Sequence, residues 1–396
     1  MKGVILAGGF GTRLRPLTFN LPKPMVPILG KPMMEHVVDV LKRTGIRDIA
    51  SLLYYQPESI SDYFGNGEEF GINMEYMQSR GDWGTAGAVK NAAGIVDDTI
   101  LVISGDVLTD FDLNRALEFH RDRSAPVTIV LTRVERPLAF GIVITDRETG
   151  KIVRFLEKPA WGQVFSDTIN TGIYVIEPRV LDYIPPEQEF DFSKDLFPLL
   201  MEKGEPIYGY ISEGYWRDVG TLRQYRRANE DALDGTIELD IPGERREIDG
   251  AEVYVGKEVK ISSSAVFEGK VLLGDGTSVG PGARISNSII GSNCRISEAS
   301  EIANSVLWDD ILLGSDCFLQ HTILAGGVTL GEGVTVEDHS VISEGCVIGE
   351  KANVSAAVKI WPRKSVGYGS VVCGSIVFGG RRSSERLSGP MRLIFL

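Results

Sequence analysis

The first part of the chain, up to about residue 235, alternates short apolar runs with helix-like segments. The apolar runs predict buried strands at 2–7, 49–55, 100–104, 127–132 and 171–176. Helical patterns cover 112–121, 193–202 and the segment between Pro32 and Gly45. Proline is favoured at the start of a helix and glycine just past its end, as in that last segment. Strands that alternate with helices predict a layered α/β domain with a mixed, mostly parallel sheet, which binds ligands beyond the carboxyl ends of its strands.

Beyond that point the apolar residues recur every six positions. Val, Ile or Leu stands at 324, 330, 336, 342, 348, 354, 360, 366 and 372, and the same step runs upstream through Val255, Ile261, Phe267, Leu273, Val279 and Ile285. Between these stretches the step slips by one position, and the slips recur at a regular interval. A helix repeats every 3.6 residues and a strand every two, so neither explains the pattern. A six-residue repeat predicts a parallel β-helix of about seven coils whose aliphatic side chains point inward, and it resembles the left-handed hexapeptide-repeat family.

The change of period predicts four parts of the chain. They are a catalytic domain at 1–235, a linker at 236–254, the β-helix at 255–380 and an irregular tail at 381–396. The linker contains a charged, proline- and glycine-containing turn at 241–246. The tail is first polar and basic and then apolar, and it resembles the start of a junction with a further domain in longer proteins. We therefore expect this chain to be a short form of a longer protein.

Composition excludes several classes of protein. The 396 residues are 43% hydrophobic and 24% charged, which is ordinary for a globular protein, and no apolar run approaches the ~18 residues of a membrane span. The four cysteines, at 294, 317, 346 and 373, lack the spacing of a zinc site or a disulfide framework, so we expect a reducing, cytoplasmic setting. The net charge of -13 argues against a nucleic-acid partner.

The charge is unevenly distributed. Residues 1–50 carry eight Lys and Arg against three acidic residues, a net of +5, so the remainder carries -18. The glycine-rich string GGFGTRLRPLT at 8–18 lies in this basic region, directly after the first predicted strand. Glycines let backbone N–H groups approach an anion, while Arg13 and Lys23 add positive charge. The string therefore predicts a phosphate cradle, with a glycine-rich turn and incidental charges as the alternative. It fits neither the dinucleotide fingerprint nor the Walker A loop.

The string closely resembles the signature of the sugar nucleotidyltransferases, the NDP-sugar pyrophosphorylases. Further matches follow in the family's order: GTAG at 84–87, SGD at 104–106, FG at 140–141, EKP at 157–159, NTG at 170–172 and WRDVGT at 216–221. The resemblance covers residues 1–235, and a hexapeptide domain occurs in several branches of the family. It implies a Rossmann-like nucleotidyltransferase domain followed by a left-handed parallel β-helix.

The resemblance also implies roles for individual residues. It implies nucleotide-binding roles for Leu6, Ala7, Gly8, Gly9, Gly11, Thr12, Arg13, Lys23, Gly84, Thr85 and Asp106. It implies sugar-phosphate-binding roles for Gly141, Glu157, Lys158, Asn170 and Thr171. The catalytic residues would be Arg13, Lys23, Asp106 and Asp218, with Mg²⁺ held by the two aspartates. The chemistry agrees, because Mg²⁺ takes one or two carboxylates together with phosphate oxygens. The alternative readings are turn-forming aspartates and, for Glu157 and Lys158, a surface ion pair.

The expected reaction transfers a nucleotidyl group from an NTP to a sugar 1-phosphate and releases pyrophosphate. The segment 84–88 lacks the glutamine of the thymidylyl and many uridylyl branches and resembles the guanylyl branch, which favours GTP and mannose 1-phosphate. UTP or dTTP with glucose 1-phosphate is the alternative.

Two other classes of function stay open. One is an additional acetyltransferase site in the β-helix, which carries His321 and His339, although His321 occupies the same repeat position as Asn287 and Asn304. A non-catalytic regulatory homologue is the other alternative. We also expect a homo-oligomer assembled through the β-helix, because flat faces and exposed coil ends favour association.

Overall fold

The computed structural model describes residues 1–79, 81–92, 94 and 98–377. Within this part the chain forms two compact units. The first comprises Met1–Phe10, Leu21–Met25 and Met33–Val219, and the second comprises Gly11–Asn20, Val26–Pro32 and the chain from Gly220 onward. The predicted tail at 381–396 lies outside the described residues.

The first unit is built around a mixed sheet with the strand order β10-β9-β11-β6-β1-β4-β5. Its parallel part consists of β1 (Lys2–Ala7), β4 (Asp48–Leu53), β5 (Asn73–Gln78) and β6 (Ile100–Ser104). The remaining strands are β8 (Val127–Arg133), β9 (Ile142–Thr145), β10 (Ile152–Leu156), β11 (Thr168–Ile176) and β12 (Ile207–Ile211). Since β11 runs antiparallel to β6, the predicted mixed sheet is confirmed.

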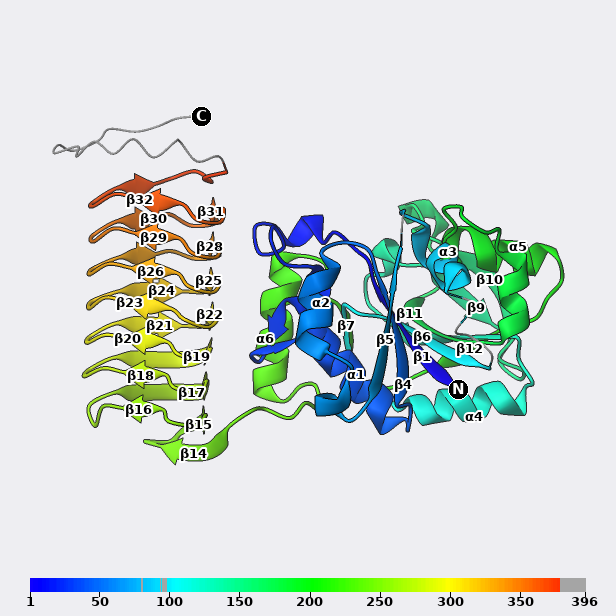
Figure 1. Ribbon diagram of the computed structural model, residues 1–396, viewed down its shortest axis with the longest axis horizontal. Helices are drawn as coiled ribbons and strands as arrows, with labels where there is room; N and C mark the ends of the chain where they lie inside the picture. The colour runs from blue at the N-terminus through cyan, green and yellow to red at the C-terminus, as the bar shows by residue number, and fades with distance from the viewer. Residues whose placement is uncertain (80, 93, 95–97, 378–396) are drawn as a thin grey trace. The chain divides into compact units, whose positions relative to one another are not determined.

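Helices cover both faces of this sheet (Figure 1). On one face, α1 (Met33–Arg43), α2 (Pro57–Phe64) and α4 (Leu113–Asp122) contribute apolar side chains to one core cluster. On the other face, α3 (Gly84–Asn91) and α5 (Phe197–Glu202) contribute to a second cluster. The unit is therefore a three-layer α/β domain, as the alternation of strands and helices predicts.

One predicted helix is divided in the structure. The pattern predicts a single helix at 193–202, whereas the chain forms a π-helical turn, η8 (Phe192–Leu196), followed by α5. Pro198 lies in the first turn of α5 and has no N–H to donate, so the regular α-helical bonding cannot run through it. The prediction was right about the helical character and wrong about its continuity.

The second unit contains the predicted β-helix, whose coils are stacked one on another (Figure 1). One face consists of β16 (Lys260–Ile261), β18 (Ser278–Val279), β20 (Arg295–Ile296), β23 (Leu312–Leu313), β26 (Thr329–Leu330), β29 (Val347–Ile348) and β32 (Ser365–Val366). The longer strands of the other sheet are β17 (Val266–Leu273) and β19 (Arg284–Ile290). Its short strands are β21 (Glu301–Ala303), β22 (Val306–Leu307), β24 (Phe318–Gln320), β25 (Ile323–Leu324), β27 (Thr335–Val336), β28 (Val341–Ile342), β30 (Asn353–Val354), β31 (Lys359–Ile360) and β33 (Val371–Val372).

The register of the coils explains the spacing found in the sequence. Leu312 pairs with Thr329 on the next coil, and Thr329 pairs with Val347 on the coil after that. The second of these steps along the chain is longer than the first by a single position. A coil whose length is a multiple of six residues keeps the apolar residues six positions apart. A coil that is one residue shorter shifts the next apolar residue by one position, which produces the slips. The aliphatic residues at the predicted inward positions form one continuous buried core, with Ile261 packed against it.

The β-helix sheet begins earlier than the spacing predicts. Residues of the predicted linker form the antiparallel strands β14 (Glu244–Ile248) and β15 (Ala251–Val255), and β15 pairs with β17. Asp249 and Gly250 connect them with φ values of 50° and 86°, the combination that a tight two-residue hairpin requires. The Asp-Gly pair was the overlooked signal for this hairpin. The same unit contains β2 (Pro27–Ile28), β3 (Lys31–Pro32) and α6 (Leu222–Asp234).

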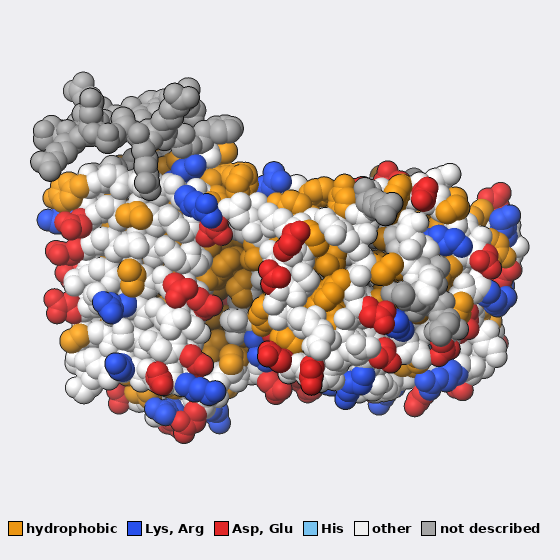
Figure 2. Space-filling view, viewed as in Figure 1, with side chains coloured by type: hydrophobic (Ala, Val, Ile, Leu, Met, Phe, Trp, Pro, Cys, Tyr) orange, Lys and Arg blue, Asp and Glu red, His pale blue; other side chains and the backbone are white. Residues whose placement is uncertain are grey.

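Positively and negatively charged side chains are scattered over the face shown in Figure 2, and they form no continuous patch of one sign there. The net charge of -13 is therefore not concentrated in one patch on this face. Among the described helices, none combines the length and the apolar character needed to cross a membrane.

Candidate active site

The candidate site of the first unit lies where the parallel strands β1 and β6 end. Gly8 and Gly9 follow β1, and the segment Ser104-Gly105-Asp106 ends β6 and turns away from it. The two strand ends are joined by a hydrogen bond of 2.9 Å from the Gly105 N–H to the Leu6 carbonyl. The candidate nucleotide-binding residues Leu6 to Gly9 and Asp106 therefore lie at the carboxyl edge of the sheet, where such folds bind ligands.

A short two-stranded ladder places Asp218 beside Asp106. Strand β7 (Val107–Thr109) pairs antiparallel with β13 (Trp216–Asp218), so that Asp218 lies opposite Val107. The ladder is extended by the Thr109 hydroxyl, which donates to the Tyr215 carbonyl at 2.7 Å. Two carboxylates that are far apart in the chain thus meet at one point.

Lys23 lies at that point and contacts both carboxylates. Its Nζ donates to Asp106 Oδ2 and to Asp218 Oδ1, the latter at 3.2 Å, and only 9% of its side chain is exposed. Burial alone would lower the pKa of Lys23, but the charges of Asp106 and Asp218 outweigh that effect and raise the pKa. The ammonium therefore stays charged between the two carboxylates.

The same pair of carboxylates fits a divalent cation. The Lys23 ammonium shows that both can converge on a single positive group. Among the described residues, no group of three or more His, Cys, Asp and Glu side chains is arranged to hold a metal. Mg²⁺ does not need such a cluster, because it binds through one or two carboxylates, water and substrate phosphates.

The candidate sugar-phosphate residues also come together, at the junction of β9, β10 and β11. The Asn170 N–H donates to the Gly141 carbonyl at 2.8 Å, and the Lys158 N–H donates to the Phe140 carbonyl at 3.2 Å. A Cβ on Gly141 would lie 2.7 Å from Glu157 Oε2 and 2.9 Å from the Phe155 ring. Glycine at 141 is therefore what allows Glu157 to lie against the strand end.

The polar groups of this cluster differ in what they can offer a ligand. Burial raises the pKa of Glu157, and its carboxylate lies 3.8 Å from the Nζ of Lys158, whose side chain is 63% exposed. Asn170 is buried and donates to Ser193 Oγ at 3.0 Å, while its Oδ1 accepts from the Gly172 N–H. The Thr171 hydroxyl is turned away and donates to the Val130 carbonyl at 2.7 Å. The hydroxyl of Thr171 is thus engaged by the neighbouring strand β8, and its sugar-phosphate role stays a prediction.

The segment Gly84-Thr85 forms the start of α3 and is tied to the turn before η8. The Thr85 hydroxyl donates to Asp191 Oδ2 at 2.9 Å and accepts from the Phe192 N–H at 3.0 Å. The Ala86 and Gly87 N–H groups both donate to the Phe190 carbonyl. Contacts with the 190–192 segment therefore fix this helix start, and the nucleotide-binding role of Thr85 stays a prediction.

The remaining candidates, Gly11, Thr12 and Arg13, belong to the second unit. They open a loop that is closed by a hydrogen bond of 2.7 Å from the Thr18 hydroxyl to the Gly11 carbonyl. Leu14 and Leu17 are buried, whereas Thr12 and Arg13 are exposed. The loop thus buries Leu14 and Leu17 and presents a hydroxyl and a guanidinium at its surface.

Two residues of the site were missed from the sequence. Ser104 donates to Asp106 Oδ1 at 2.5 Å, opposite the oxygen that faces Lys23. Asp191 contacts Thr85 and caps η8 by accepting from the Ser193 and Lys194 N–H groups. An aspartate directly before a helical segment is a typical N-cap, so the signal for Asp191 was present.

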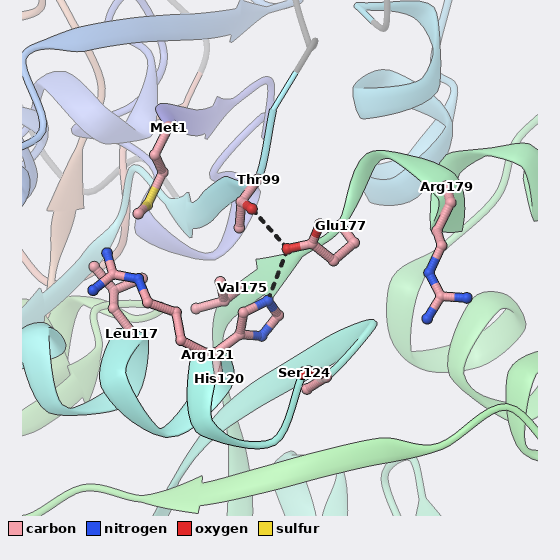
Figure 3. Close-up of a pocket in the computed structure, with 10 residues that line it drawn as sticks. Met1, Thr99, Leu117, His120, Arg121, Ser124, Val175, Glu177 and Arg179 are labelled. Atoms are coloured by element: carbon pink, nitrogen blue, oxygen red, sulfur yellow. Dashed lines mark hydrogen bonds and ion pairs between the residues drawn. The ribbon is translucent and has the colours of Figure 1, made fainter.

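A cavity of about 330 Å³ lies at the opposite edge of the sheet, near the starts of β1 and β6. Buried His120 and the hydroxyl of Thr99 both contact Glu177 Oε1 there, at 3.1 and 2.6 Å (Figure 3). Because the candidate residues lie at the carboxyl edge, this cavity is separate from the site described above.

The two histidines of the β-helix occupy corners of its coils. His321 has a φ of 47°, close to the 43° of Asn287 and the 49° of Asn304. His339 contacts the guanidinium of Arg226 in α6, and His321 Nδ1 lies 2.9 Å from Asp338 Oδ1. The shared backbone geometry agrees with the interpretation of 321 as a repeat position.

Two family models match successive parts of the chain. A family model described as nucleotidyl transferase matches residues 2–235, and one described as the EIF2B subunit epsilon LbH domain matches residues 250–354. The chain is 38% identical to a UTP–glucose-1-phosphate uridylyltransferase of Synechocystis over 344 residues, covering 82% of this chain and 87% of that protein. It is 37% identical to a mannose-1-phosphate guanylyltransferase of Mycobacterium tuberculosis, covering 75% and 81% of the two chains. A mannose-1-phosphate guanyltransferase of Yarrowia lipolytica is 34% identical, with 83% and 98% covered.

A solved structure shows the same fold over part of the chain. A crystal structure from Bacillus anthracis, described as a putative glucose-1-phosphate thymidylyltransferase in complex with sucrose, superposes with a TM-score of 0.55 at 29% identity. The match covers 61% of this chain and 97% of the Bacillus anthracis chain.

Proposed function

The chain belongs to the nucleotidyl transferase family, and from this premise we propose that it joins a nucleoside triphosphate to a sugar 1-phosphate, giving an NDP-sugar and pyrophosphate. The observation that carries the proposal is the convergence of Lys23, Asp106 and Asp218 at the carboxyl edge of the sheet. One buried ammonium and two carboxylates form a charge-dense site of the kind that phosphate transfer requires.

The reaction is a direct displacement at phosphorus. A phosphate oxygen of the sugar 1-phosphate attacks the α-phosphorus of the NTP, a new P–O bond forms, and the bond to the β-phosphate oxygen breaks. The electron pair of that bond leaves with pyrophosphate. The attacking oxygen is already anionic, so no side chain has to remove a proton, and catalysis depends on positioning and charge neutralisation.

The residues divide this work between them. Lys23 neutralises charge on the α-phosphate, and Arg13 binds the outer phosphates through its forked guanidinium. Glu157 and Asn170 hold the sugar hydroxyls, and the exposed ammonium of Lys158 binds the sugar phosphate. Asp106 and Asp218 would hold Mg²⁺, which would supply positive charge to the phosphate oxygens.

For the substrates we propose GTP and mannose 1-phosphate. The GTAG segment at 84–87 and the mannose-1-phosphate guanylyltransferases among the relatives support this pair. The second candidate is UTP or dTTP with glucose 1-phosphate, because a uridylyltransferase is 38% identical over a comparable length.

The test measures the reaction with every combination of several nucleotides and two sugar phosphates. Pyrophosphate release is measured with GTP, UTP, dTTP, ATP and CTP, each combined with mannose and glucose 1-phosphate. We expect one pair to exceed the others, and Lys23→Ala and Asp106→Asn to lose at least about 100-fold in kcat. Lys90→Ala is the matched control, because its ammonium pairs only loosely with the exposed Asp182, at 3.7 Å. Near-normal turnover in both site variants, or no pyrophosphate with any pair, would contradict the proposal.

We also propose that the β-helix joins copies of this chain in a cytoplasmic homo-oligomer. Apolar side chains of Val347 and Val371 are 47% and 66% exposed at outward strand positions, and all four cysteines are free thiols, as in reducing compartments. Light scattering measures the assembly. A monomer at all concentrations would contradict this part.

A further inference from the structure

The glycine-rich loop Gly11–Asn20 is internally rigid. Its backbone is tied by hydrogen bonds from Leu14 to Gly11, from Leu17 to Leu14 and from Phe19 to Pro16, at 2.9–3.3 Å. The Thr18 hydroxyl closes the loop on the Gly11 carbonyl. Because the turns fix the loop's own shape, its position is decided by what holds its outer end.

Within the second unit, that outer end is held by two neighbouring coils of the β-helix. The buried Ser343 hydroxyl donates to the Pro16 carbonyl at 3.0 Å, and Asn20 Nδ2 donates to Glu344 Oε1 at 2.7 Å. The rings of Phe19 and Trp361 meet edge to face, with centroids 5.2 Å apart. Such an aromatic pair stabilises beyond its buried area, and the hydroxyl bond is shielded from water.

The segment Val26–Pro32 is held in a similar way. Trp308 of the β-helix donates its indole N–H to the Tyr225 hydroxyl at 2.9 Å, and that hydroxyl donates to the Pro27 carbonyl at 2.8 Å. Both Tyr225 and Trp308 belong to the same unit as Pro27. Lys23 lies in the short stretch Leu21–Met25, so the chain on either side of Lys23 is anchored to coils of the β-helix.

We infer that Ser343, Glu344 and Trp361 are positioning residues for nucleotide binding. They fix the loop whose exposed Thr12 and Arg13 receive the triphosphate, so the β-helix supports the NTP site in addition to any role in assembly. This inference rests on the proposed function, because it assigns the loop to the NTP. None of the three residues touches the reacting atoms.

The test compares KM values for the two substrates. We expect Trp361→Ala to raise KM for the preferred NTP about tenfold and to leave KM for the sugar 1-phosphate within about twofold, since a small misplacement of a binding group is costly. Trp361→Phe keeps a ring against Phe19 and should restore most of the loss. Tyr368→Ala is the matched control, because it removes an aromatic ring that is 68% exposed on the same β-helix. Calorimetry with the NTP alone should show the same weakening without turnover.

A double-mutant cycle separates positioning from a general loss of structure. Phe19→Ala and Trp361→Ala each remove the same contact, so the double variant should bind the NTP no more weakly than the worse single variant. Additive losses, an equal rise in both KM values, or an NTP affinity unchanged by Trp361→Ala would overturn the inference. If no NTP and sugar pair gives pyrophosphate with the unmodified chain, the proposed function itself fails. If the unmodified chain is active and Trp361→Ala binds the NTP with unchanged affinity, only the positioning role is refuted.

Discussion

The Nζ of Lys23 lies 3.2 Å from Oδ1 of Asp218, although 195 positions separate the two residues in the chain. The same nitrogen also contacts Asp106, so a single ammonium neutralises two carboxylates. Removing a buried cation from such a group leaves like charges facing each other, which is costly in a poorly solvated position. The arrangement therefore couples the stability of the first unit to whatever cation sits between the aspartates.

The first prediction follows from that coupling. In Lys23→Met the two carboxylates lose their shared cation, and we expect the free energy of unfolding to fall by about 3–5 kcal/mol in a metal chelator. Mg²⁺ should recover part of this loss, so Tm should rise more with added Mg²⁺ in the variant than in the unmodified protein. Thermal unfolding with EDTA and with increasing MgCl₂ measures the difference.

Lys90→Met is the control for this prediction. Lys90 lies 3.7 Å from the exposed carboxylate of Asp182, and a pair of that kind contributes at most about 1 kcal/mol. Its Tm should respond to Mg²⁺ as the unmodified protein does. An identical Mg²⁺ response in Lys23→Met and Lys90→Met would show that the two aspartates do not share a cation site.

The second prediction concerns Gly141. In Gly141→Ala the new methyl group would lie 2.7 Å from Glu157 Oε2 and 2.9 Å from the Phe155 ring, so the Glu157 side chain must move. We expect KM for the sugar 1-phosphate to rise about tenfold, with a stability loss of about 1–3 kcal/mol from overpacking. Gly162→Ala is the matched control, because no atom from outside its own turn lies within 4 Å of its added Cβ. If KM for the sugar 1-phosphate is equal in Gly141→Ala and Gly162→Ala, Glu157 does not bind the sugar and the prediction is wrong.

The third prediction concerns the pH dependence of stability. Burial lowers the pKa of His120 from its ordinary value of 6.5, although Glu177 opposes the shift and Arg121 adds to it. The neutral ring accepts from the Thr128 hydroxyl and donates to Glu177. Because the unfolded chain binds the proton more readily, the stabilisation is complete above about pH 6.5 and is lost as the pH falls toward the folded-state pKa.

Urea unfolding between pH 7.5 and 5 measures this effect. His120→Phe should flatten the loss of stability below pH 6.5, since no proton is taken up at that position. Thr128→Val keeps the imidazole and should lower stability at every pH without flattening the slope. If the stability of His120→Phe falls with pH as steeply as that of the unmodified protein, other groups cause the acid sensitivity and the prediction is wrong.

The sequence predicted those features that repeat or that follow directly from one strand. Six-residue spacing marked the inward positions of the β-helix because each coil places the same face toward the core. The segment 104–106 was recognised because an aspartate directly follows an apolar strand. The candidate sugar-phosphate cluster was predicted only through its family motifs, since Gly141 precedes β9, Glu157 follows β10 and Asn170 lies within β11.

The remaining features depend on contacts that local patterns do not encode. The ladder that joins Asp106 to Asp218 consists of two strands of three residues, which are too short to show a period. The direction of the Thr171 hydroxyl follows from the irregular pairing of β11 with β8 between Asn170 and Ile173. The support of the glycine-rich loop by Ser343 and Trp361 joins residues more than 300 positions apart, and nothing in the loop's own sequence indicates it.

The last prediction tests the stacking of the β-helix with two neighbouring leucines. Leu312 and Leu313 both belong to β23, but Leu313 is 2% exposed within the core and Leu312 is 45% exposed on the outside. Leu313→Ala leaves a cavity between coils, so we expect it to lower the free energy of unfolding by about 2–5 kcal/mol. Leu312→Ala removes the same atoms from the outer surface and should change it by less than about 0.5 kcal/mol. Urea unfolding of the two variants measures the difference, and equal losses would contradict the inward register that the six-residue spacing predicts.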